Sequence, residues 1–472
     1  MQAYNPYLPS WEYIPDGEPH VYDGRVYVYG SHDRFRGHAY CLNDYVCWSA
    51  PVNDLADWRY EGVIFRRTDD PDDPDGEGCL FAPDVTRGPD GRYYLYYVLS
   101  NRNFVSVAVC DAPAGKYEYL GNVRYADGTR LGEREGDEPQ FDPGVLTEGD
   151  RTYMYTGFCG RNDKSRTGPM MTVLGPDMLT VVEPPVTIMP SQPYAKGTQW
   201  EGHEFFEASS IRRFNGVYYF VYSSVVLHEL CYATSDKPGG PFTYGGVLVS
   251  NCDMHIDTYK PADMPAYYGA NNHGGMAQIG DDYYIFYHRH TEGTCFSRQG
   301  MAQKIELRPD GSIPQVEMTS CGLNGGPLKG EGTYPAYIAC NLFTDKPCVY
   351  TGGGDGNGFM DGCYPKITQD GGDGDENPGY IANMRDTATC GFKYFDCKGV
   401  RRVGVRVRGY AGGSFAVKTA WDGPELGSIP VRYSNLWTDF FADIAIPDGV
   451  NAIYFTYRGH GVAQLASFTL ER

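Results

Sequence analysis

The sequence predicts an all-β protein, in which a five-bladed β-propeller is followed by a β-sandwich. Forty tyrosines and 60 glycines among 472 residues favour many short strands joined by turns. One short pattern recurs five times between Asp23 and Tyr287. Residues 334–472 contain further short alternating runs and no convincing amphipathic helix. A chain of this length is expected to hold more than one domain.

The repeated pattern is a turn that pairs Gly with Asp or Asn, followed by a Tyr-rich run of period two. The five copies are Asp23–Tyr29, Asp90–Tyr97, Gly149–Tyr155, Asn215–Tyr222 and Gly280–Tyr287. Each copy predicts a β-hairpin. Their spacing of roughly 60 residues fits a propeller blade of four strands with generous loops. A simple sandwich could carry hairpin signals, but five at such regular intervals favour the propeller.

The segments after the fifth repeat set the domain limits. Residues 298–314 predict one last hairpin that completes the propeller, which gives a first domain of residues 1–320. Residues 321–333 are rich in glycine and are expected to form a linker. Residues 334–472, with alternating runs such as Gly399–Arg408 and Ala452–Tyr457, predict the sandwich.

Charge and cysteine usage limit the partners and the compartment. Forty basic and 60 acidic residues give a net charge of −20, which disfavours nucleic acid and anionic membrane surfaces and is compatible with a neutral substrate. The N-terminus has no signal-peptide pattern, and the 14 cysteines include no Cys-x-x-Cys pair. We therefore expect reduced thiols in a cytoplasmic protein, although a secreted chain trimmed of its signal peptide would look the same. The sequence leaves the oligomeric state open.

An ionisable residue precedes the turn glycine of every repeat by seven to nine positions. These residues are Asp16, Asp84, Asp142, Glu207 and His273. The innermost strand of each blade lines the central channel of a propeller, so we expect the five side chains on these strands to meet at one mouth of the channel.

Three of these residues suit the hydrolysis of a glycosidic bond. That reaction needs a carboxylic acid that protonates the leaving oxygen and a carboxylate that activates water or attacks. A third carboxylate nearby raises the pKa of the acid. Asp16, Asp142 and Glu207 supply the set. Each alone could be a turn or solvated strand residue, but their shared position in the repeat favours a catalytic role.

Three further residues are candidates for contacts around the carboxylates. Asp84 could contact substrate or cap a turn. His273 would face the channel, contacting substrate or holding a Ca²⁺ or Na⁺ ion directly or through water, because carboxylates attract cations to the axis. Arg298 could donate to substrate hydroxyls or pair with the carboxylates. The chemistry itself requires no cofactor.

These motifs together resemble glycoside hydrolase family 43. Asp16–Gly30 is similar to the opening strand that carries the general base of the family, except that Gly17 replaces the usual Pro. Phe141–Leu146 resembles the segment with the Asp that modulates the acid, and Phe206–Phe220 the segment with the general-acid Glu. Asp84, His273 and Arg298 match further landmarks of the family. The resemblance implies an inverting enzyme that releases arabinose or xylose units from plant-type oligosaccharides, as an α-L-arabinofuranosidase, a β-xylosidase or both.

The second domain resembles a family 6 carbohydrate-binding module. The similarity rests on Gly379–Ala382, Gly391–Phe395 and Asn435–Thr438. The usual Asn near the end of such a module is not evident in Ala463–Phe468. The domain could therefore bind sugar or only buttress the propeller, and Trp437 could be a stacking platform or a core residue.

Three alternative functions remain open at this point. A non-catalytic sugar-binding propeller would seldom need three carboxylates in one position of the repeat. An exo-galactosidase of the same family would share the catalytic residues. A propeller phosphorylase would need several cationic phosphate ligands near the axis, and only Arg298 is suitable.

Overall fold

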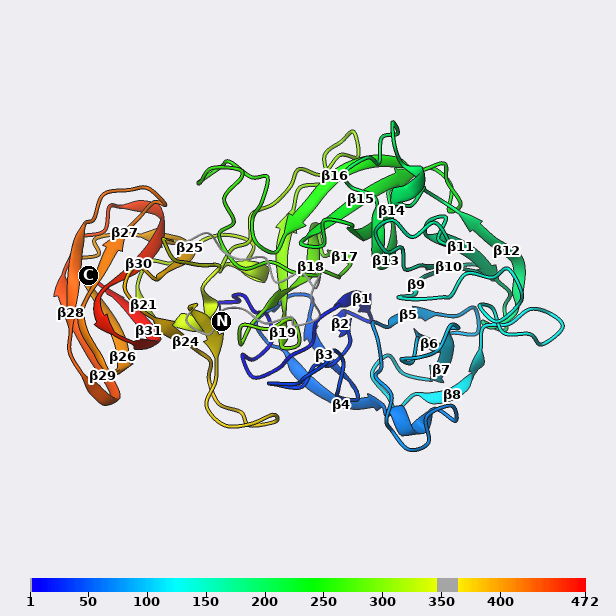
Figure 1. Ribbon diagram of the computed structural model, residues 1–472, viewed down its shortest axis with the longest axis horizontal. Coiled ribbons are helices and arrows are strands. Elements are labelled where there is room, and N and C mark those ends of the chain that lie inside the picture. Colours follow the sequence, from blue (N-terminus) through cyan, green and yellow to red (C-terminus); the bar gives the residue numbers. More distant parts are fainter. Residues whose placement is uncertain (1, 346–363) are drawn as a thin grey trace.

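The computed structural model describes residues 2–345 and 364–472 and confirms the all-β prediction. A five-sheet propeller and a two-sheet sandwich lie side by side (Figure 1). The described helices are short 3₁₀ turns, η1 (Arg67–Asp69), η2 (Gln192–Tyr194), η3 (Gly322–Asn324) and η4 (Ala336–Ile338). No helix in these residues is long and apolar enough to cross a membrane. Residues 346–363 of the predicted sandwich lie outside the described residues.

Four blades of the propeller are four-stranded antiparallel sheets in chain order. The first holds β1 (Glu18–Tyr22), β2 (Arg25–Tyr29), β3 (Tyr45–Pro51) and β4 (Arg59–Phe65). The second holds β5 (Asp84–Arg87), β6 (Tyr93–Tyr97), β7 (Ser106–Cys110) and β8 (Glu118–Asn122). The third holds β9 (Gly144–Glu148), β10 (Arg151–Thr156), β11 (Met170–Leu174) and β12 (Val181–Thr187). The fourth holds β13 (Phe205–Phe214), β14 (Val217–Ser224), β15 (Glu229–Ser235) and β16 (Thr243–Ser250).

The five repeated hairpins are the first two strands of the five blades. The Tyr-rich runs form β2, β6, β10, β14 and the start of β18 (Asp282–His290). The turn glycines of all five repeats have a positive φ, between 63° and 88°. Glycine adopts this left-handed conformation without steric cost, which explains why every copy of the repeat contains it.

The first strands of the blades surround the axis. They are neighbours in the order β1, β5, β9, β13 and β17 (Met276–Ile279), and β17 returns to β1. A parallel bridge between Gly17 and Gly274 joins the first and last blades.

The fifth blade has three strands, because β17 and β18 are followed only by β19 (Arg298–Ile305). The last hairpin predicted for residues 298–314 is therefore wrong in its second arm, since no described strand follows β19 within this blade. The Asn5 side chain makes some of the hydrogen bonds to β19 that a fourth strand would make. Its amide donates to the Ala302 carbonyl at 2.8 Å, and its carbonyl accepts from the Ala302 N–H at 3.0 Å.

Two six-stranded sheets form the sandwich. One contains β20 (Leu328–Lys329), β25 (Thr389–Cys397), β30 (Gly449–Gly461), β27 (Ala411–Lys418) and β28 (Gly427–Val431), with β22 (Asn341–Phe343) beside β25. The other contains β23 (Lys366–Thr368), β24 (Tyr380–Met384), β31 (Ala463–Glu471), β26 (Arg402–Gly409) and β29 (Ser434–Asp443), with β21 (Gly332–Pro335) beside β31. Because β20 and the start of β21 lie in residues 321–333, this segment is not the free linker that its composition predicted.

The two domains share one hydrophobic core. It runs from propeller residues such as Tyr287 and Met301 to sandwich residues such as Phe392 and Phe468. Two buried cations lie at this boundary. Arg289 of β18 donates to the carbonyls of Tyr337 and Ala339 at 2.7 and 2.8 Å. Lys393 of β25 is paired with propeller-side carboxylates, so polar contacts accompany the apolar ones.

Candidate active site

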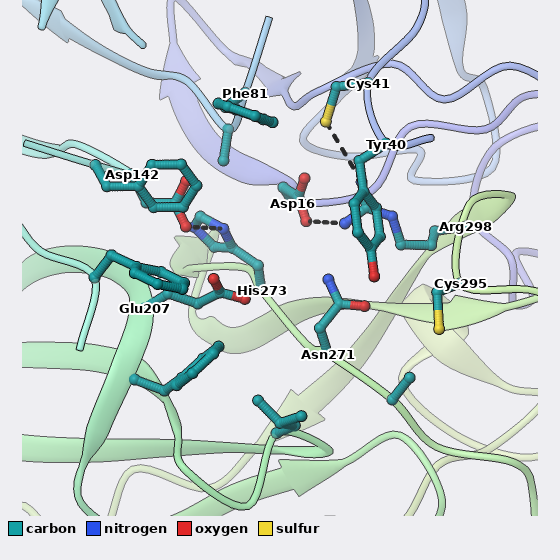
Figure 2. A pocket seen from close by; sticks show the side chains of 16 residues that line it. Asp16, Tyr40, Cys41, Phe81, Asp142, Glu207, Asn271, His273, Cys295 and Arg298 are labelled. Atoms are coloured by element: carbon teal, nitrogen blue, oxygen red, sulfur yellow. Dashed lines mark hydrogen bonds and ion pairs between the residues drawn. The ribbon is translucent and has the colours of Figure 1, made fainter. Parts of the chain in front are cut away.

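A pocket of about 250 Å³ contains five of the six predicted site residues, at the mouth of the propeller axis. Figure 2 shows Asp16, Asp142, Glu207, His273 and Arg298 around this one cavity, although they come from five different segments of the chain. Four of them are buried, and Glu207 is partly buried. The repeat therefore correctly predicts the convergence of four of its five ionisable residues, all but Asp84.

The backbone decides which acidic residue faces the cavity. Asp16 and Asp142 were expected on strands, but they lie just before β1 and β9. Both have a positive φ, 57° and 43°. Glu207 lies inside β13 at a register shift, and the following Ala208 has a φ of 70°. These irregular positions turn the three carboxylates out of the sheet pattern and into the pocket.

Cationic and polar partners surround Asp16. Its Oδ1 lies 2.9 Å from Arg298 Nη1 and 3.2 Å from His288 Nδ1, and Ser31 Oγ donates to Oδ2. Burial alone would raise the pKa of Asp16, but Arg298 and His288 outweigh it and hold this pKa well below its usual range. Asp16 is therefore ionised at neutral pH.

The pKa of Glu207 is shifted in the opposite direction. Burial raises its pKa to about 7, and the negative charge of Asp16 adds to that effect. Burial, with the charges of Glu207 and Asp16, also raises the pKa of Asp142 well above its usual value. One oxygen of Asp142 accepts the Ala208 amide at 3.2 Å. In mildly acidic solution the site thus combines an ionised carboxylate with protonated carboxyl groups in one cavity.

Asp84 is the predicted site residue that does not line the pocket, so the prediction that it contacts substrate is wrong. It is fully buried at the start of β5. His20 Nε2 lies 2.6 Å from one oxygen, and the Val145 amide donates to the other at 2.8 Å. Asp84 lies on a regular strand, so its side chain joins neighbouring blades instead of turning toward the cavity.

His273 lies in the pocket wall between carboxylates. Its Nδ1 is 3.6 Å from Asp142 and its Nε2 is 4.0 Å from Glu18. Burial lowers its pKa to about 4, so the ring is neutral at pH 7. Two groups of described residues bring three possible metal ligands within 4.8 Å of one another, Glu18–His20–Asp84 and His203–Glu229–Cys231, and neither includes His273. The geometry gives no support to His273 as a direct metal ligand; a contact through water stays a prediction.

Arg298 is the only described pocket residue with a permanent positive charge, and it is fully paired. Besides Asp16, its guanidinium contacts both oxygens of Asp33 at 2.8 and 2.9 Å. This arrangement fits the predicted pairing with carboxylates. A cluster of free cations for phosphate is not found among the described lining residues, so the phosphorylase alternative gains no support.

An aromatic wall was missed by the sequence reasoning. Phe81, Phe141, Phe158 and Phe206 follow one another with ring centroids 5.1 to 5.5 Å apart. Tyr40 stands at another side of the cavity, with the Arg298 guanidinium 4.8 Å from its ring centroid. Phe141 and Phe206 each precede a site carboxylate by one residue, a signal that the sequence did contain. Aromatic walls of this kind suit the apolar faces of a sugar ring.

A buried pocket that opposes an ionised carboxylate to a protonated carboxyl group, with aromatic walls, is the site of a glycoside hydrolase. The comparison with protein families agrees with this class. The model of the glycosyl hydrolases family 43 matches residues 13–313, and the chain belongs to this family. The predicted family, fold and glycosidase class are confirmed.

Three known proteins illustrate the similarity. A xylosidase/arabinosidase of Thermoclostridium stercorarium is 70% identical over 99% of both chains. CoXyl43 is a β-xylosidase/α-arabinofuranosidase from a compost metagenome whose structure was solved with xylotriose in a calcium-free form. It is 26% identical to this chain with a TM-score of 0.53, and the match covers 67% of this chain and 97% of CoXyl43. An arabinoxylan arabinofuranohydrolase structure from Bacillus subtilis, 20% identical with a TM-score of 0.52 over 99% of this chain and 97% of its own, supports the two-domain fold.

The likeness of the sandwich to a sugar-binding module remains a prediction, because the family match ends at residue 313. Trp437 lines a cleft on the sandwich together with Tyr380 and Arg406. The guanidinium of Arg408 lies 4.3 Å from the Trp437 ring centroid and Tyr380 packs edge-on against it. Trp437 is therefore half-buried by neighbours rather than being a fully open platform.

Proposed function

We propose that the protein is an inverting glycosidase that releases arabinose or xylose units from oligosaccharides. The names of its relatives support the substrate class, since the relative with 70% identity is a xylosidase/arabinosidase and CoXyl43 was solved with xylotriose. The observation that carries the mechanism is the opposite protonation of Asp16 and Glu207 in one pocket. Hydrolysis by paired carboxyl groups requires this combination, and inversion is what the similarity to the family implies.

In this mechanism Asp16 is the general base and Glu207 is the general acid. Asp16 accepts a proton from the water that attacks the anomeric carbon, while Glu207 donates its proton to the departing glycosidic oxygen. The bond to the leaving group breaks as the bond to water forms, so the configuration inverts in a single displacement. The two carboxyl groups are expected to stand roughly 6.5–9.5 Å apart to admit that water.

Asp142, His273 and Arg298 support the pair. Asp142 is held by the Ala208 amide next to the acid and presents a carboxyl group to the sugar. The neutral His273 beside it can exchange hydrogen bonds with sugar hydroxyls or water. Arg298 keeps Asp16 ionised. These steps use side chains of the chain alone and need no cofactor.

A cation near the axis is not needed to balance charge at the carboxylates beneath the pocket. Arg212 Nη2 lies 2.6 Å from Glu18, and Nη1 lies 3.9 Å from Asp84. This buried guanidinium already supplies positive charge to the Glu18–His20–Asp84 group. A calcium or sodium ion held through water at His273 stays a proposal; the activity measured with added chelator tests calcium, and replacement of sodium by another monovalent cation in the buffer tests sodium.

The acid assignment is tested with two kinds of leaving group. Glu207→Ala should lose about 10²- to 10⁴-fold in kcat on xylo- or arabino-oligosaccharides, whose alcohol leaving group needs a proton. The same variant should lose much less in its chemical step on an aryl pentoside, whose leaving group departs as a stable anion. Steady-state and single-turnover rates of both substrates, normalised to the wild type, measure this difference.

Asp16→Ala is the matched control, because activation of water is needed with either leaving group. It should be severely slowed on both substrates alike. Equal losses of Glu207→Ala on both substrates, with chemistry limiting the rate, would contradict its role as the acid. The anomer released first, followed by NMR, tests inversion. A panel of pentofuranosides, pentopyranosides and galactosides distinguishes the proposed substrates from those of an exo-galactosidase.

A further inference from the structure

Two loops of the propeller line part of the pocket and also contact the sandwich. Residues 30–44, between β2 and β3, carry Tyr40 and Cys41 of the pocket wall. Residues 291–297, between β18 and β19, carry Cys295. The loops contact each other, since the rings of Tyr40 and Phe296 pack edge-on with centroids 4.8 Å apart. A shift of either loop would therefore alter the wall at Tyr40 and Cys295 (Figure 2).

The sandwich holds the first of these loops through Asp373. This residue lies in the segment between β23 and β24, which is yellow in Figure 1. Its Oδ1 accepts the Phe35 amide at 2.7 Å, and its Oδ2 accepts from Asn43 Nδ2 at 3.1 Å. One carboxylate thus joins both ends of the segment that carries Tyr40. The stacking of Tyr13 on Phe35, with Tyr13 donating to Gln369 at 2.8 Å, strengthens the same contact.

The sandwich holds the second loop through Lys366 of β23. Its ammonium donates to the carbonyl and to the carboxylate of Glu292 at 3.1 and 2.8 Å. The Glu292 amide donates to the Ile367 carbonyl at 2.8 Å, so backbone and side chain are both fixed. Glu292 also accepts from Arg36 of the first loop at 3.1 Å. Lys366 and Glu292 therefore tie the two loops to each other and to the sandwich.

We infer that the sandwich fixes the shape of the active site. Asp373 and Lys366 are the positioning residues, and they hold the pocket wall at Tyr40 and Cys295. This inference rests on the proposed function of the pocket. It does not extend to every member of the family, because CoXyl43 corresponds along 97% of its length to only 67% of this chain. Partly exposed ion pairs add little stability, but a displacement of about 1 Å near a reacting sugar can cost about 10²-fold in rate.

The experiment uses the full chain with Asp373→Ala, Lys366→Met and the double variant. The substrate is a small aryl pentoside, which fills the pocket without reaching the outer face of the sandwich. The double variant should lose roughly 10- to 100-fold in kcat/KM, with KM raised as well as kcat lowered, while its melting temperature stays close to that of the wild type. Lys366→Arg, which keeps the cation, should restore most of the loss of Lys366→Met.

Two controls separate positioning from general effects on the sandwich. Glu376→Ala removes an exposed acid from the same segment as Asp373. Arg402→Met removes the ion pair to Glu471, which lies within the sandwich. Both should retain wild-type kinetics. Wild-type kinetics in the double variant, or equal losses in Arg402→Met, would overturn the inference.

The outcomes also distinguish this inference from the proposed function. If the wild type cleaves aryl pentosides and Asp16→Ala does not, the pocket is catalytic whatever the result for Asp373 and Lys366. If the double variant cleaves the small substrate normally and is impaired only on polymeric arabinoxylan, the sandwich acts as a sugar-binding module, and positioning of the pocket is refuted.

Discussion

Arg298 links the protonation states of the pocket carboxyl groups. Its contacts with Asp16 and Asp33 keep it charged despite complete burial. The guanidinium holds Asp16 in its ionised form, and the resulting negative charge helps to raise the pKa of Glu207 to about 7. The main source of the raised pKa of Glu207 is burial, followed by the negative charge of Asp16. Repulsion between Glu207 and Asp142 also favours protonation in this pair, in keeping with the influence predicted for the third carboxylate.

This linkage predicts the pH dependence of kcat/KM on oligosaccharides. Asp16 must be ionised, and its low pKa keeps it so down to acidic pH. Glu207 must be protonated, so activity should be level in mildly acidic buffer and fall as the pH rises through about 7, by about tenfold per unit. Glu207→Ala, measured on an aryl pentoside, should lose this basic limb. If the fall in kcat/KM at basic pH persists in the variant, it is caused by the titration of a group other than Glu207.

At this scale the sequence predicts residue types well and side-chain directions less well. Asp84 and Asp142 hold equivalent places before their turn glycines, yet only Asp142 reaches the pocket. The difference lies in a positive φ at Asp142, which the repeat spacing does not reveal. Asp33 pairs with Arg298 and His288 contacts Asp16, but neither residue could be predicted from the repeat, because both lie outside its shared position.

Among the secondary-structure elements, the fifth blade is the most unusual. The β19 strand has no strand partner on its outer edge among the described residues, and Asn5 pairs with it through a side chain instead. The same side chain donates to the Thr319 carbonyl at 3.0 Å. Asn5 is fully buried, so these contacts are shielded from water.

Asn5→Ala should therefore destabilise the closure of the propeller. It would leave the Ala302 amide and the Ala302 and Thr319 carbonyls without this partner in a buried site, at a cost of roughly 2–5 kcal/mol in the free energy of unfolding. Chemical and thermal denaturation measure the loss. Asn324→Ala, which removes a more exposed amide near the same site, should cost much less. Equal stability of the two variants would contradict the role given to Asn5.

The hairpins could be predicted because they are local. Each needs a glycine with positive φ and an alternating run, and both are visible in one short window. The missing fourth strand could not be predicted in this way, because its substitute lies 297 residues away at Asn5. The same reason explains β20 and β21: their partners in the sandwich, β25 and β31, are distant in sequence.

At the scale of the whole molecule, Lys393 joins the two domains. Its ammonium is fully buried, 3.2 Å from Asp253 and 2.9 Å from Glu317, and lies 3.3 Å from the Tyr259 ring centroid. Both carboxylates come from the propeller side of the boundary, so the ion pairs work together with the shared core.

Lys393→Met should lower the stability of the entire chain. Removing one partner leaves buried carboxylates without their cation, at a cost of about 3–5 kcal/mol. The wild type should unfold in one calorimetric transition, and the variant should do so at a lower temperature. Lys398→Met, at an exposed position immediately after β25, is the control and should melt like the wild type. Two separate transitions in the wild type would show that the domains are not coupled.

The shared core has a consequence for protein engineering. A glycine-rich boundary suggests that the sandwich domain could be transferred to other enzymes, or deleted to leave the catalytic domain alone. In this chain a cut near residue 320 would uncover buried apolar residues on both fragments, among them Met318, Leu328 and Ile338. Exposed apolar surface of that kind promotes aggregation. Fragments of this enzyme therefore call for replacement of these residues by polar ones before they are expressed separately.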